Sequence, residues 1–206
     1  DNLLNDCDAL ISTWEIPALN PRALAKASGL KIIAHAGGQV RFFLPESIFD
    51  LRPDMLICNA SNVMARPVAE HTLLMSIALL RNLCFISRWA AEHDQWENYP
   101  PEKNVSLLNK KVGVVGLGQI ANEFIELARP FKVEFQVFSR HLGDFDAEAR
   151  GLKKRSLEQI FSDCDVITIS AANTPENRHM INHDLLRMIK PGAVLVNNAR
   201  GALIDE

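Results

Sequence analysis

The sequence lacks three features that would each point to a particular class of protein: a long uncharged apolar run, a large excess of one charge, and paired cysteines. No run of about 18 uncharged apolar residues occurs, so we expect no membrane span. No basic-then-apolar leader opens the chain, so we expect a cytoplasmic protein. The formal net charge of −3 argues against nucleic acid or an anionic membrane as a partner. With 206 residues, 48% of them hydrophobic, the chain can bury an ample core.

The four cysteines, Cys7, Cys58, Cys84 and Cys164, form no CxxC pair and have no metal-ligand spacing with histidine. We therefore expect no metal site. Three of them lie in apolar stretches, where a thiol usually serves as a small buried hydrophobe. This usage is typical of a protein from a reducing compartment.

Short apolar runs alternate with amphipathic runs, which is the pattern of βαβ units around a mainly parallel sheet. We expect early strands at residues 9–12, 31–34 and 55–58. A strongly apolar helix is expected from Pro67 to about Leu83, and its apolar residues cover so much of its circumference that we expect burial on more than one side. An ordinary core position, a place between two domains and a dimer interface all fit that pattern.

The most informative stretch is KKVGVVGLGQIA (residues 110–121), in which a short apolar strand leads directly into Gly116-x-Gly118-x-x-Ala121. Gly116 permits a tight turn, and Gly118 lets the backbone approach a pyrophosphate. The small Ala121 lets the following helix, expected over residues 122–129, pack closely on the strand. These residue types at this spacing predict a dinucleotide-binding turn.

The context of the turn supports this interpretation. The N-terminus of the following helix offers free N–H groups and partial positive charge to phosphates. A further strand is expected at residues 134–138, at the distance that a Rossmann unit requires. A purely structural glycine turn and an S-adenosyl-methionine-type Rossmann site are the alternatives.

The end of that second strand indicates which dinucleotide binds. An NAD site usually has Asp or Glu there, about 20 residues after the first glycine, to hold the ribose 2′-hydroxyl. Here Ser139 stands 23 residues after Gly116 (139 − 116), followed by Arg140 and His141. These side chains would attract a 2′-phosphate, whereas an Asp would repel it. We therefore favour NADP(H), with NAD(H) as the alternative if Arg140 and His141 are only solvated loop residues.

Three further stretches, in the same order along the chain, resemble the D-2-hydroxyacid dehydrogenase family: ARPVAEHTL (residues 65–73), DVI followed by TPENRHMIN (residues 165–182) and KPGAVLVNNARG (residues 190–201). The resemblance implies an α/β fold in which a Rossmann doubly wound parallel sheet is preceded by part of a flavodoxin-like α/β substrate domain. The implied layout is a partial substrate domain over residues 1–66, an interdomain helix and linker over 67–109, with polar residues 94–109 as the linker, and a dinucleotide-binding domain over 110–206.

The resemblance also implies the reaction, which is hydride transfer between NAD(P)H and C2 of a small 2-oxo or 2-hydroxy acid, specific for the D isomer. Arg200 is the implied catalytic and substrate-binding cation, because its planar fork suits a carboxylate. The Gly37-Gly38 loop resembles the family's substrate-carboxylate loop. The expected dinucleotide contacts are Gly116, Gly118, Gln119, Ile120, Ser139, Arg140, His141, Ala172, Asn198 and Ala199.

The family's catalytic Glu and His follow the Arg-Gly pair, and the sequence ends six residues after Arg200. We therefore expect little turnover from this segment alone. Two other functions stay open: a dinucleotide-binding module like the C-terminal-binding-protein corepressors, and an inactive truncated paralogue. The expected partners are a small 2-oxo or 2-hydroxy acid and, from the apolar helix after Pro67, a second copy of the chain.

Overall fold

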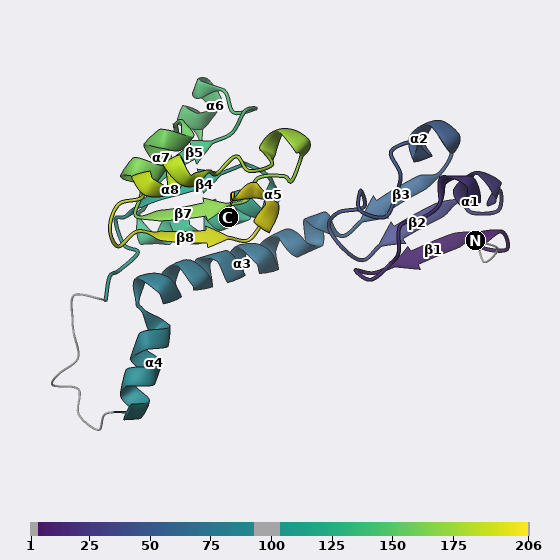
Figure 1. The fold of residues 1–206 in the computed structure, drawn as a ribbon. Helices are drawn as coiled ribbons and strands as arrows, with labels where there is room; N and C mark the ends of the chain where they lie inside the picture. Colours follow the sequence, from purple (N-terminus) through teal and green to yellow (C-terminus); the bar gives the residue numbers. More distant parts are fainter. Residues whose placement is uncertain (1–3, 93–103, 206) are drawn as a thin grey trace. The chain divides into compact units, whose positions relative to one another are not determined.

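A computed structural model describes residues 4–92 and 104–205, and the chain divides into two compact units, Asp1–Ala65 and Arg66–Glu206. Each unit has its own parallel sheet, flanked by helices (Figure 1). The predicted α/β fold class is therefore confirmed. Of the expected linker, residues 94–103 lie outside the described residues, and residues 104–109 form neither helix nor strand.

The first unit contains a three-stranded parallel sheet in the order β1-β2-β3. Its elements are β1 (Ala9–Ser12), α1 (Pro21–Lys26), β2 (Ile32–His35), α2 (Ile48–Leu51) and β3 (Leu56–Asn59). The strands agree with the sequence prediction to within one residue. The side chain of Asn20 accepts a hydrogen bond from the Arg22 N–H and so caps α1. Leu24, Ile33 and Ile48 are fully buried between the helices and one face of this sheet.

The long apolar helix differs from its prediction in two ways. It begins at Ser61, six residues before the expected start, and α3 (Ser61–Leu80) therefore contains Pro67, which cannot donate a hydrogen bond to the preceding turn. A second helix, α4, follows over Leu83–Glu92. From Arg66 onwards the buried residues of α3 form a single stripe: Ala69, Thr72, Ser76 and Leu80. Within the second unit α3 is buried on one side, and Leu74 is 59% exposed, so burial of a second side stays a prediction.

By length and composition alone, α3 could also cross a membrane, and it is the one such helix among the described residues, with a mean hydropathy of 1.3 in its most apolar window. No membrane span was expected from the sequence. Helices in the cores of globular proteins meet the same criterion. Ala69 and Leu80 of α3 belong to a hydrophobic cluster of the second unit, and Leu73 and Ile77 pack against that cluster.

The second unit contains a five-stranded parallel sheet in the order β6-β5-β4-β7-β8. Its elements from residue 110 onwards are β4 (Lys111–Val115), α5 (Gln119–Ala128), η4 (Arg129–Phe131), β5 (Glu134–Phe138), α6 (Asp144–Ala149), β6 (Lys153–Lys154), α7 (Leu157–Asp163), β7 (Val166–Ile169), η5 (Pro175–Asn177), α8 (His183–Met188), β8 (Val194–Asn197) and η6 (Gly201–Leu203). The strand order reverses between β4 and β7. In doubly wound sheets, ligands bind at such a reversal, beside the carboxyl ends of the strands.

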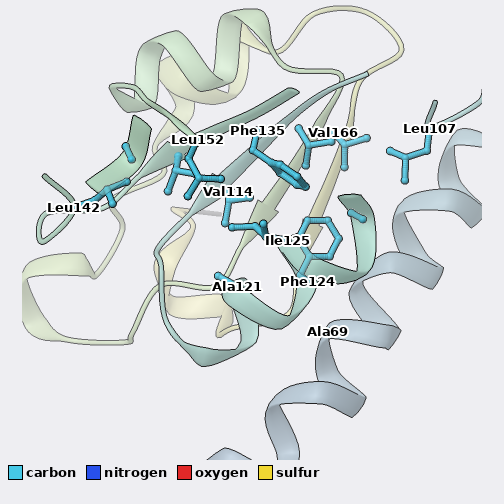
Figure 2. Packing of buried hydrophobic residues seen from close by; sticks show 14 of the residues in the cluster. Ala69, Leu107, Val114, Ala121, Phe124, Ile125, Phe135, Leu142, Leu152 and Val166 are labelled. Carbon is cyan, nitrogen blue, oxygen red and sulfur yellow. The ribbon is translucent and has the colours of Figure 1, made fainter. Parts of the chain in front are cut away.

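Each face of this sheet carries its own hydrophobic cluster. On one face, Val114 of β4 packs with Phe124 and Ile125 of α5, in the cluster drawn in Figure 2. On the other face, Val115 packs with Ile160 of α7. Alternate residues of one strand thus enter opposite layers, as they must in a parallel sheet covered on both faces. These layers hold the carboxyl ends of β4 and β7 rigidly beside each other.

Candidate dinucleotide site

The first glycine of the predicted turn is required by the fold itself. Gly116 has φ +91°, a conformation that L side chains rarely adopt. A Cβ at this position would also lie 2.6 Å from Ala171 Cα and 2.7 Å from Ala171 N, at the end of β7. The chain therefore turns at Gly116 in direct contact with the neighbouring strand, at the point where the strand order reverses.

The second glycine has a different role, because nothing in the protein requires it. Gly118 is the N-cap of α5, with φ −91°, and a Cβ built on it meets no atom within 4 Å. The space beside Gly118 is open, so a ligand can approach the backbone at the start of the ten-residue helix α5. This open space is what a pyrophosphate at a Rossmann turn needs.

A hollow of about 510 Å³ lies against this turn. It collects residues from the carboxyl ends of β4, β5 and β7, and its lining consists of Gly116, Leu117, Gly118, Phe138, Ser139, Arg140, His141, Ser170, Ala171, Ala172, Thr174, Glu176, Asn177 and Met180. Six of the ten expected dinucleotide contacts are in this lining. The other four, Gln119, Ile120, Asn198 and Ala199, are not.

The polar end of the hollow is formed by the three residues after β5. Ser139 Oγ accepts a weak hydrogen bond from the His141 N–H at 3.4 Å. The Arg140 guanidinium donates to the Glu176 carbonyl oxygen at 3.4 Å, and both residues line the hollow. No carboxylate occupies the position of Ser139. A 2′-phosphate at this position would therefore meet a hydroxyl and an arginine.

Several lining residues were not predicted from the sequence, most of them in the segment after β7. Of that segment only Ala172 was predicted, although Thr174, Glu176 and Asn177 also line the hollow. The Asn177 side-chain amide donates to the Ala172 carbonyl at 2.8 Å and so holds this segment folded. The parallel order of the strands was a usable signal, because the ends of β4 and β7 meet at the same edge of the sheet.

Asn198 ties elements of the second unit together. Its side-chain amide donates to Thr72 Oγ1 of α3, and its Oδ1 accepts a hydrogen bond from Ser170 Oγ at 3.3 Å. Thr72 is fully buried, so this contact anchors α3 to the ends of β7 and β8. Arg200 follows β8 at the same edge of the sheet as Gly116, is exposed, and donates to the Ala199 carbonyl at 2.7 Å.

In the first unit, the Gly37-Gly38 loop follows β2 and is tied back through its carbonyls. The Gly37 carbonyl accepts from the Ala60 N–H at 2.9 Å, and the Gly38 carbonyl accepts from Ser61 Oγ at 2.6 Å. Among residues 4–92 and 104–205, no group accepts a hydrogen bond from the Gly37 or Gly38 N–H. Gly37 itself is buried in this loop, and Gly38 is half-buried.

His35 is packed directly against this loop. The ring is 2% exposed, its Nδ1 lies 3.0 Å from Ser12 Oγ, and aromatic rings surround it, with the Phe43 centroid at 5.0 Å. The buried Nε2 has no hydrogen-bond partner among the described residues and lies 2.3 Å from where a Gly37 Cβ would be. The histidine ring thus fills the space that a side chain at position 37 would need.

The opposite, amino edge of the second sheet is closed by ion pairs. Lys111 Nζ lies 2.7 Å from Asp163 Oδ1, and the buried Gln136 amide donates to Asp163 Oδ2 at 2.6 Å. These hydrogen bonds, from Lys111 first and then from Gln136, lower the pKa of Asp163. Burial raises the pKa of the neighbouring Cys164 thiol to about 12, which leaves it protonated and inert.

The cysteines only partly follow the prediction. Cys164 is buried, but Cys58 and Cys84 are exposed, because each lies on a side of its strand or helix that the described chain leaves uncovered. All four are free thiols. In the part of the chain that the structure describes, no group of three or more His, Cys, Asp or Glu side chains is placed to hold a metal ion.

Comparison with known proteins agrees with the geometry of this edge. Residues 73–206 match the family model described as D-isomer specific 2-hydroxyacid dehydrogenase, NAD binding domain. The chain belongs to this family, and its cofactor is a nicotinamide dinucleotide. The resemblance found in the sequence is confirmed.

Individual relatives are distant, and each is longer than this chain. The chain is 30% identical over 182 residues to D-3-phosphoglycerate dehydrogenase of Bacillus subtilis, a match that covers 88% of this chain and 34% of the relative. It is 31% identical over 209 residues to formate dehydrogenase of Pseudomonas sp., covering 98% and 51%. The solved structure of Granulicella M. formate dehydrogenase superposes with a TM-score of 0.81 at 27% identity, covering 99% of this chain and 55% of that one. The chain spans about half or less of these relatives.

Proposed function

We propose that this chain is the cofactor-binding part of an NADP(H)-preferring oxidoreductase that transfers hydride to or from C2 of a small 2-oxo or 2-hydroxy acid, specific for the D isomer. The open space beside Gly118, at the reversal point of a parallel sheet, is the observation that supports this proposal most strongly. When bound, the dinucleotide supplies the hydride. A relative 26% identical over 213 residues, covering 98% of this chain and 61% of the relative, is glyoxylate reductase of Pyrococcus furiosus, whose name supports a small 2-oxo acid.

The proposed division of labour follows the two units. Residues 1–66 contribute to substrate binding, and residues 110–206 hold the dinucleotide. Residues 67–109 form the helix and linker that connect these two parts of the chain. In this proposal the Gly37 and Gly38 N–H groups and the Arg200 guanidinium hold the substrate carboxylate, and Arg200 polarises the 2-oxygen. The proton donor and its carboxylate partner belong to the family's sequence after the Arg-Gly pair.

The dinucleotide contacts are proposed in two groups. Gly116, Gly118, Ser139, Arg140, His141 and Ala172 contact it from the lining of the hollow. Gln119 and Ile120, the first two residues of α5, offer backbone N–H groups to the pyrophosphate, as the start of a helix does. Asn198 and Ala199, after β8, contact the nicotinamide end.

The preference for NADP(H) rests on the three residues after β5. Ser139 stands where an acid is usual, and Arg140 lines the same hollow, which supports pairing of its guanidinium with a 2′-phosphate. We expect the purified chain to bind NADPH about tenfold more tightly than NADH, measured by the fluorescence of the reduced nicotinamide during titration. Arg140→Gln should reduce that ratio and leave NADH affinity unchanged.

The same titration can overturn the proposal. Equal or tighter binding of NADH would contradict the preference for NADP(H) and leave the dinucleotide site in place. Failure of both nucleotides to bind a folded chain would contradict the site itself. A corepressor-like module or an inactive paralogue would bind the nucleotide with no turnover in the full-length parent, so a 2-oxo acid assay with the parent protein separates these alternatives.

We also propose a homodimer in the cytoplasm. Leu74 and Leu79 of α3 and Leu83 of α4 are large apolar side chains that are 59%, 43% and 49% exposed. A second copy covering these side chains would remove their apolar area from water. The four free cysteines fit a reducing compartment. Sedimentation of wild type and Leu74→Glu should give a dimer and a monomer, respectively; a monomeric wild type would contradict the proposal.

A further inference from the structure

A second hollow, of about 340 Å³, lies beside the first. The two share Leu117, Ser139 and His141, so the end of β5 borders both. The second hollow extends away from β7 towards helix α6, where Asp146 and Arg150 line it. A group attached at Ser139 can therefore project into either hollow.

Arg150 has the features of an anion-binding residue. Its Nη2 donates to Asn122 Oδ1 of α5 at 2.6 Å, which holds the guanidinium in place. Asn122 is neutral, so this hydrogen bond leaves the positive charge uncompensated. Among the described residues, no carboxylate lies within ion-pair distance of Arg150, although Asp146 lines the same hollow. A fixed guanidinium with unpaired charge is suited to bind a phosphate.

We propose that Arg150 is a specificity-determining residue, which binds the 2′-phosphate of NADP(H) in this second hollow together with Ser139. The inference rests on the proposed function, because it takes the ribose 2′ position to lie at Ser139. It adds a second cation, from α6, to the Arg140 that the sequence indicated. Arg150 lies eleven residues after Ser139 (150 − 139), and only the return of α6 towards the start of α5 brings it near.

A change at Asp146 should alter NADPH affinity in the opposite direction to a change at Arg150. Its carboxylate lines the hollow and would repel a phosphate, so its charge opposes that of Arg150. Removal of the Asp146 charge should therefore strengthen NADPH binding, whereas removal of the Arg150 charge should weaken it. Neither change should affect NADH, which has no 2′-phosphate.

The experiment titrates NADPH and NADH against the whole 206-residue chain and the variants Arg150→Gln, Arg150→Lys, Asp146→Asn and Arg187→Gln. Arg187 is an exposed arginine of α8 outside both hollows and serves as the control for net charge. For Arg150→Gln we expect about a tenfold loss of NADPH affinity with NADH unchanged, and for Arg150→Lys a smaller loss. For Asp146→Asn we expect a gain of about two- to threefold. Arg187→Gln should match wild type.

The outcomes separate this inference from the proposed function. Suppose that wild type prefers NADPH and that Arg140→Gln abolishes this preference. If Arg150→Gln then keeps the preference, the role of Arg150 alone is overturned. Wild type that does not prefer NADPH would overturn both. If Arg150→Gln weakened NADPH and NADH equally, its role would be to support α5 through Asn122, and the inference would be wrong. Competition by adenosine 2′,5′-bisphosphate against 5′-AMP should repeat the same pattern without the nicotinamide.

Discussion

Two glycine loops, one in each unit, follow a strand of a parallel sheet. They share a division of roles between their two glycines and differ in what forces the first one. In each pair, the first glycine is required by the protein: Gly116 is forced by φ +91° and by Ala171, and Gly37 by the ring of His35. The second glycine is not: Gly118 meets nothing within 4 Å, and Gly38 meets only Ser61 Oγ at 3.7 Å. The first glycine therefore builds the loop, and the second leaves its outer surface open.

A glycine motif can therefore contain one glycine that the fold requires and one that a ligand requires, and mutation can separate the two roles. A substitution at the first glycine should act on stability, and a substitution at the second should act on binding. The loops also differ in what forces the first glycine, which is rigid backbone beside Gly116 and a side chain beside Gly37. The expected cost of a methyl group differs accordingly.

The largest effect on stability is expected for Gly116→Ala. The positive φ and a backbone clash that cannot relax should together lower the free energy of unfolding by about 3 kcal/mol. The measurement is urea denaturation followed by circular dichroism. The matched control is Gly192→Ala, because Gly192 also has a positive φ, +81°, but has no atom within 4 Å of its Cβ position. That control should cost only about 1 kcal/mol, and equal costs at both positions would contradict the clash with Ala171.

A smaller loss, about 2 kcal/mol, is expected for Gly37→Ala. The new methyl group would press on a histidine ring held by Ser12 and by aromatic neighbours. In a His35→Ala background the same substitution should cost clearly less, and a double-mutant cycle by urea denaturation measures that coupling. Gly38→Ala should be close to neutral. Additive effects of the changes at positions 35 and 37 would show that the ring does not determine the glycine.

A still smaller loss than at Gly37 is expected at the opposite, amino edge of the second sheet. Asp163→Asn should lower the free energy of unfolding by about 1 kcal/mol at most, because Lys111 and Asp163 are 42% and 45% exposed. The folded state lowers the pKa of Asp163, so its stabilisation is complete above the ordinary carboxyl pKa of about 3.9 and disappears as the pH falls through the lowered value.

Urea titrations of wild type and Asp163→Asn from pH 7 to pH 3 check this sign, and the difference in stability between the two should shrink towards the acid end. Asp8→Asn is the control, because its pair with Lys31 is 80% and 76% exposed and should contribute almost nothing at any pH. A difference for Asp163→Asn that grows towards acid would contradict the assigned direction.

The sequence predicted those parts of the molecule that local patterns determine. Strands β1 and β5 have the predicted bounds, and the turn at Gly116 connects strand to helix as expected. The start of α3 was missed because a proline in a helix usually stands in the first turn. Pro67 instead lies inside α3, six residues after its start. The exposure of Leu74 was missed because apolar composition does not show which side of a helix has a partner within the chain.

The hollow could be predicted only in part, for the same physical reason. Residues next to the glycine turn or at the end of β5 have recognisable spacing, and six expected contacts do line it. Glu176 and Met180 lie far along the chain and reach the hollow only because β7 pairs with β4. Arg150 required the return of α6 towards α5, which no local pattern encodes.

The central claim, that the second glycine of the turn is there for a ligand, is tested most directly by Gly118→Ala. The φ of −91° suits alanine, and its Cβ meets no protein atom. We therefore expect the melting temperature of this variant to equal that of wild type. Its NADPH affinity, measured by titration, should be at least about tenfold weaker. Unchanged NADPH affinity in the folded variant would contradict the account, and so would a melting temperature that falls as far as that of Gly116→Ala.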